Sequence, residues 1–159
     1  MPKTEKELAE AAKHISYEWG MLRGAAESDW HRLPVTAGSF QKLINSNART
    51  ELVLLHARLL YDFLFTFSDD GDDVQAPDFL EGAAATNWRK DRPRLAKTYC
   101  PILTKDRRRL NKRLFHLSYK RETLPKGWDM RGIVAELSNA LQYFKSQLSP
   151  QRVKLLFTV

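Results

Sequence analysis

The residues of this chain that could do chemistry lie around Arg109 and His116. They are seven positions apart, so two helical turns bring both side chains back to nearly the same face of a helix. A neutral imidazole can take a proton from a ribose 2′-hydroxyl, and a guanidinium can stabilise the charge that develops on the attacked phosphate. The pair predicts phosphodiester chemistry, with His116 as acid or base, Arg109 as phosphate stabiliser and Asn111 assisting in positioning.

A strongly basic segment surrounds this pair. Between Arg89 and Lys126 there are fourteen basic and three acidic residues, a local net charge of +11 in a chain whose total is +7. Such a cluster attracts polyanions, because neutralising phosphates releases their counterions. RNA is therefore a candidate partner, and the residues expected to contact it are Arg108, Lys112, Arg113, Lys120 and Arg121.

The segment RLNKRLFH, residues 109–116, resembles the Arg-x(4–6)-His motif of HEPN-type ribonucleases. The resemblance implies an all-helical domain that cleaves RNA without a metal ion. It also implies that the motif residues of two protomers meet at a dimer interface. Arg49 and His56 satisfy the same spacing.

A second resemblance is carried by HARLLYDF (56–63), DDVQAPDF (72–79) and NKRLFHLSYKR (111–121), which look like an uncharacterised group of small bacterial helical proteins. Arg58 and Asp62 are four residues apart on one helix and can form an ion pair. The resemblance suggests a polar cluster formed by His56, Arg58, Asp62, Asp73, His116, Tyr119 and Arg121.

An acidic segment offers a different interpretation of the charges. Asp69 to Glu81 contains six acidic residues and no basic one. If this segment neutralises the basic helix, within one chain or between two copies, the protein is a non-catalytic interaction module with weak affinity for nucleic acid. Its partner would then be a second copy or an acidic protein, and His116 would have a structural role.

The hydrophobic pattern predicts how these residues are positioned. Apolar residues recur at helical spacing over residues 4–26, 40–67, 101–121 and 129–148, with Thr4 and Asp129 as N-caps. Shorter elements are expected at 77–80 and 83–90, and prolines at 93 and 101 are expected to interrupt the chain. The fold class is therefore all-α, an antiparallel bundle of four to five helices. Residues 1–159 form one domain, and 151–159 are a candidate for a loosely packed tail.

Other classes of protein have little support in the sequence. Cys100 is the only cysteine, and the longest apolar stretch, Leu52 to Phe67, contains His56, Arg58 and Asp62. We therefore expect a cytoplasmic protein without a membrane partner. A calcium-loop spacing in 70–81 lacks the required glycine, and no glycine-rich phosphate loop occurs, so neither metal nor cofactor is expected.

Overall fold

The computed structural model describes residues 3–27, 38–111 and 127–157. Within these ranges the chain is all-helical and contains no strand, which confirms the all-α part of the predicted fold class. The elements in chain order are α1 (Glu5–Glu27), α2 (Ser39–Phe65), the 3₁₀ helix η1 (Ala76–Phe79), α3 (Gly82–Tyr99), α4 (Pro101–Leu110), α5 (Met130–Ser146) and α6 (Pro150–Phe157).

Two helices begin at the predicted caps. At the start of α1, the Thr4 backbone N–H donates to the Glu7 carboxylate over 2.7 Å, and the Glu7 N–H donates to the Thr4 hydroxyl over 3.3 Å. At the start of α5, the Asp129 carboxylate accepts from the backbone N–H of Gly132 over 2.8 Å. These contacts satisfy N–H groups that have no partner inside the helix.

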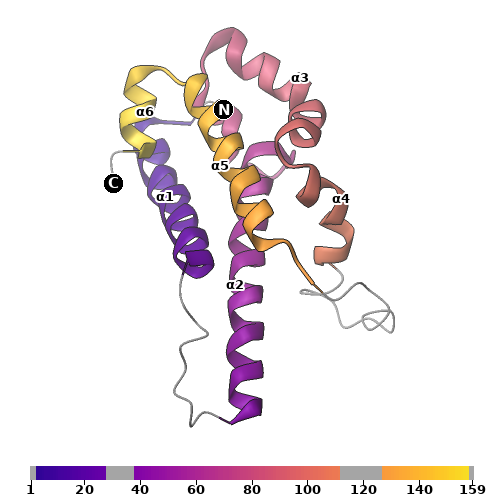
Figure 1. Cartoon of the computed structure of the whole chain (residues 1–159). Helices are drawn as coiled ribbons and strands as arrows, with labels where there is room; N and C mark the ends of the chain where they lie inside the picture. Colours follow the sequence, from indigo (N-terminus) through magenta and orange to yellow (C-terminus); the bar gives the residue numbers. More distant parts are fainter. Residues whose placement is uncertain (1–2, 28–37, 112–126, 158–159) are drawn as a thin grey trace.

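Helix α2 is the longest element and runs beside α1, with α5, α3 and α4 packed along its C-terminal half (Figure 1). One of its faces is fully buried and presents small and branched apolar residues at helical spacing: Val53, Ala57, Leu60 and Leu64. Its N-terminal half extends past the ends of α1 and α4 in Figure 1. The two halves of α2 therefore have different surroundings.

Helix α3 differs from the sequence prediction, because it continues through Pro93 to Tyr99 instead of ending near residue 90. Proline lacks a backbone N–H, so one helical hydrogen bond to the Arg89 carbonyl is lost. The Nε of Arg92 donates to that carbonyl over 3.3 Å. Beyond the proline, Leu95 and Ala96 are buried, and their packing favours continued helix.

Aromatic side chains fill the space between α2, α3 and α5. The Trp88 indole is 3% exposed and donates to the Leu64 carbonyl over 2.8 Å, which satisfies its one polar atom inside the core. Its ring is stacked with that of Phe65 at 6.2 Å and meets Phe144 edge-on at 5.3 Å. Trp88 is thus a packing residue and not a surface platform for bases.

The C-terminal helix α6 lies against α1. Leu156 is buried, and its carbonyl accepts from the Ser16 hydroxyl over 2.9 Å. Arg152 donates from Nη1 to the Glu5 carboxylate over 2.6 Å. Residues 151–157 of the region expected to be a loose tail therefore belong to a helix held to α1 by apolar and polar contacts.

Candidate functional site

The basic helix α4 begins at Pro101, a residue suited to the first helical turn because its φ is fixed and it needs no N–H partner. The next two backbone N–H groups, of Ile102 and Leu103, donate to the Glu136 carboxylate of α5 over 2.8 and 3.4 Å. Burial raises the pKa of Glu136 and outweighs the opposite effect of these hydrogen bonds. Glu136 therefore fixes the start of α4 against α5.

Arg109, the predicted phosphate stabiliser, makes contacts within the protein. Its side chain is 13% exposed, and Nη1 donates to the Asp106 carboxylate over 3.1 Å. Nη2 donates to the Gly127 carbonyl, and the guanidinium carbon lies 3.9 Å from the centre of the Trp128 ring. Such a set of contacts ties the end of α4 to the segment that leads into α5.

Arg49, from the second pair with the same spacing, is also engaged internally. Its Nε donates to the Ala25 carbonyl over 3.0 Å, and its Nη2 donates to the Ala26 carbonyl over 2.5 Å. Carbonyls in the last turn of a helix have no helical partner, and a cation there is favourable to the helix dipole. Arg49 therefore caps α1.

His56 is buried between α1 and α2. Its Nδ1 lies 2.5 Å from a carboxylate oxygen of Glu18, and Tyr17 meets the ring edge-on at 6.2 Å. The buried Nε2 has no hydrogen-bond partner among the described residues. The Glu18 contact shows that His56 connects α1 to α2.

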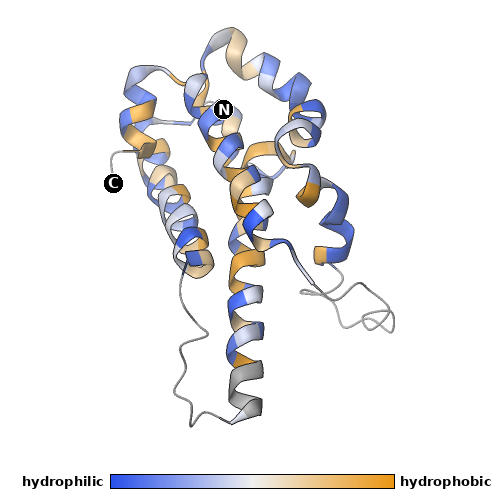
Figure 2. Ribbon diagram, in the orientation of Figure 1, coloured by the Kyte–Doolittle hydropathy of each residue, from blue (hydrophilic) through white to orange (hydrophobic). Residues whose placement is uncertain are grey.

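The cations of α3 and α4 are mostly on the surface. These helices hold nine basic residues against two acidic ones, Asp91 and Asp106, and the acidic pair is engaged by Arg94 at 2.8 Å and by Arg109. Hydrophilic residues follow both helices in Figure 2. We call the exposed cations the α3–α4 basic surface: Arg89, Lys90, Arg94, Lys97, Lys105, Arg107 and Arg108.

The acidic segment forms no described ion pair with these cations, although Asp73 and Arg107 line the same groove. Asp69, Asp70, Asp72 and Asp73 are exposed, and within the described ranges no ion pair joins any of them to a cation of α3 or α4. The segment is instead held by its own turn contacts, such as the Asp72 N–H donating to the Asp70 carboxylate over 3.1 Å. As far as the structure describes the chain, the acidic segment does not neutralise the α3–α4 basic surface.

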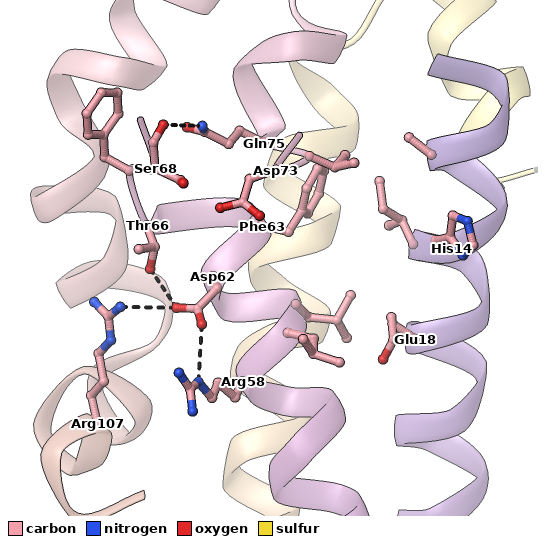
Figure 3. Close-up of a pocket in the computed structure, with 16 residues that line it drawn as sticks. His14, Glu18, Arg58, Asp62, Phe63, Thr66, Ser68, Asp73, Gln75 and Arg107 are labelled. Carbon is pink, nitrogen blue, oxygen red and sulfur yellow. Dashed lines mark hydrogen bonds and ion pairs between the residues drawn. The ribbon is translucent and has the colours of Figure 1, made fainter. Parts of the chain in front are cut away.

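A second feature is a groove of about 620 Å³ on the outer side of α2, between α1 and α4. Asp62 lies at its centre, where its two carboxylate oxygens accept from Nε of Arg58 over 3.3 Å and from Nη2 of Arg107 over 3.2 Å. The Thr66 hydroxyl also donates to Asp62, over 2.7 Å (Figure 3). The predicted Arg58–Asp62 pair is thus confirmed, and both carboxylate oxygens of Asp62 have partners.

The groove brings together part of the predicted polar cluster. Arg58, Asp62 and Asp73 line it, whereas His56 does not and contacts Glu18 instead. Arg107 was missed by the sequence analysis, because it is 45 residues from Asp62 and only the packing of α4 beside α2 makes them neighbours. We call this feature the α2 groove; on its apolar side lie Leu59, Phe63, Phe67 and Val74.

The remaining predicted site residues lie outside the described ranges: Lys112, Arg113, His116, Tyr119, Lys120 and Arg121. Asn111, at the edge of the described range, is partly buried, and its Oδ1 has no hydrogen-bond partner among described residues. The structure therefore does not test the pairing of Arg109 with His116.

The described residues show neither a metal-binding cluster nor a helix suited to a membrane. No group of three His, Cys, Asp or Glu side chains there is arranged to hold a metal ion. None of the described helices has the length and apolar character that crossing a membrane requires. No protein-family model, curated protein or solved structure matches this chain.

Proposed function

We propose that the protein binds RNA through the α3–α4 basic surface. The observation that carries this proposal is the exposure of seven cations on two consecutive helices, whose only acidic residues are already paired with Arg94 and Arg109. Phosphates of a nucleic acid backbone provide the spaced negative charges that such a surface can bind.

The position of the acidic segment favours RNA binding over internal neutralisation. Exposed aspartates at 69, 70, 72 and 73 make no described ion pair with α3 or α4, and of the seven surface cations only Arg94 and Arg107 have a described ion pair. A pairing of the two charged regions between copies, or with an acidic protein, is the rival proposal.

Binding can be measured by fluorescence anisotropy with a short labelled RNA over a range of salt concentrations. The variant K97A/K105A/R108A removes three cations of the α3–α4 basic surface, and K6A/K13A/R23A removes three exposed cations of α1 as a matched control. If each lost cation contacts one phosphate, the salt slope falls by about 2, at roughly 0.7 per contact for single strands. Equal affinities for the two variants would overturn the proposal, and a flat salt response would favour the rival.

Metal-independent RNA cleavage is an extension of this proposal and depends on His116. Arg109 contacts Asp106, Gly127 and Trp128, which supports a positioning role for this arginine. A nuclease mechanism would require the same guanidinium to stabilise the phosphate as well. The test is cleavage of an RNA pool in the presence of a chelator. A nuclease is supported if the wild type cleaves the RNA and if His116→Ala and Arg109→Ala both lose cleavage but stay folded. Unchanged cleavage in either variant would exclude the assigned pair.

A cytoplasmic location and a bundle of four to five helices also stay predictions.

A further inference from the structure

The outer face of α2 carries exposed apolar side chains that no described element covers. Six large apolar residues of the described ranges are at least 36% exposed, among them Leu59 at 43% and Phe67 at 59%. Leu59, Phe67 and Val74 line the α2 groove. Clustered exposed apolar residues of this kind mark an interaction surface.

One stripe on α2 holds the exposed Ala48, Leu55 and Leu59 and the partly buried Leu52. Ala48, Leu52, Leu55 and Leu59 are separated by four, three and four positions, which places them on one side of the helix. Leu55 and Leu59 are exposed, whereas the opposite side, represented by Val53 and Leu60, is buried at 0–1% exposure. Helix α2 is therefore apolar on two sides, and the described part of the chain covers only one of them.

The shape of the surface fits a helix. From Ile44 to Leu59 the stripe is about 22 Å long at 1.5 Å per residue. It continues from the α2 groove along the N-terminal half of α2, which extends beyond α1 and α4 (Figure 1). A small molecule would fill the groove but leave the exposed Ile44 and Leu55 uncovered.

We propose that the occupant is a second copy of this chain, whose α2 packs antiparallel on the first. With Leu52 opposite Leu55 of the second copy, Ala48 lies opposite Leu59, and each pair occurs twice by symmetry. The extended N-terminal half of each α2 then lies in the α2 groove of the other copy. The interface closes on itself with two-fold symmetry, as expected of a homodimer.

Charges along the edge of the stripe agree with this arrangement. Glu51 is exposed and lies one heptad before Arg58, so both occupy the same edge of the apolar stripe. In an antiparallel pair, residues on the same edge face each other, and Glu51 of each copy approaches Arg58 of the other. Within its own copy, Arg58 also contacts the Asp62 carboxylate, which Arg107 shares.

The first test is the mass of the protein in solution, measured by light scattering after size exclusion at micromolar concentrations. We expect a dimer for the full chain and a monomer for Leu55→Asp, because a carboxylate would be buried opposite Leu52. Leu55 is 36% exposed, so the monomer should keep its helical circular dichroism. Gln142→Asp, on the exposed side of α5, is the matched control and stays dimeric. A monomeric wild type, or a dimeric Leu55→Asp protein, overturns the proposal.

The second test addresses the direction of the helices. Residues 48 and 59 of one chain are about 16 Å apart along α2, too far for a disulfide, but they are opposite each other between copies. The double variant A48C/L59C should therefore form a disulfide-linked dimer under mild oxidation, while A48C and L59C alone should not. Cys100 is buried and does not compete. Absence of the linked dimer in the double variant, or equal linking in a single variant, overturns the antiparallel arrangement. RNA binding is proposed on α3 and α4. If RNA binding fails its own test, the expected dimer mass and the expected disulfide-linked dimer are unaffected.

Discussion

The α3–α4 basic surface and the outer face of α2 differ in the force by which each could hold a partner. On α3 and α4 the exposed side chains are largely cations, and the large apolar residues Trp88, Leu95, Leu103 and Leu110 are buried. On the outer face of α2 the exposed side chains are mainly apolar, and Arg58, Arg107 and Asp62 neutralise one another in part. The first surface should bind by a salt-dependent attraction and the second by burial of apolar area, which salt weakens little.

The largest expected effect is a separation of the two interactions by mutation. Leu55→Asp should abolish the dimer but leave the affinity for a short RNA within about twofold, because distant sites act independently. K97A/K105A/R108A should lose RNA affinity and keep the dimer mass. Anisotropy and light scattering on the same samples provide both measurements. If either variant loses both interactions while its circular dichroism is unchanged, the two surfaces are one site.

The next effect compares two neighbouring arginines of α4. Arg109→Ala should lower the free energy of unfolding by about 2 kcal/mol, since it removes charged hydrogen bonds from a half-buried site. Arg108→Ala, at an exposed position, should change it by less than about 0.5 kcal/mol. Urea denaturation followed by circular dichroism measures both values. Equal stabilities would contradict the structural role of Arg109.

A smaller effect is expected at the start of α5. Asp129→Ala removes the acceptor for the Gly132 N–H and should cost about 1 kcal/mol of unfolding free energy. Gln142→Ala, exposed later in the same helix, serves as control and should be close to neutral. Thermal unfolding of the two variants is sufficient, and a cost at Gln142 that equals the cost at Asp129 would argue against the cap.

The smallest effect is a dependence of stability on pH through Glu136. Because burial raises its pKa in the folded state, the folded protein binds the proton more tightly than the unfolded chain. Its contribution to stability is therefore complete below the unfolded pKa of about 4.5 and declines as pH rises through the folded value. Glu136→Gln cannot titrate, so the difference in melting temperature between wild type and variant should shift in favour of the variant from pH 4 to pH 7. If the difference in melting temperature is constant from pH 4 to pH 7, the raised pKa of Glu136 in the folded protein is contradicted.

Much of the fold could be predicted from local signals in the sequence. Spacing and side-chain chemistry suffice to predict contacts between residues no more than four positions apart. Such local features are the caps at Thr4 and Asp129, the start of α4 at Pro101 and the Arg58–Asp62 pair. The continuation of α3 through Pro93 was missed, because it depends on the burial of Leu95 and Ala96 by other elements.

The sequence by itself determined that the chain is helical and that its cations are concentrated after residue 89. Only the tertiary structure decided how individual charged residues are used. It placed Arg109 against Trp128, Arg107 against Asp62 and His56 against Glu18, and it formed no described ion pair between the acidic segment and the cations of α3 and α4. The physical reason is that helix formation follows from neighbours along the chain. A pairing across 38 or 45 residues depends instead on which helix faces pack together.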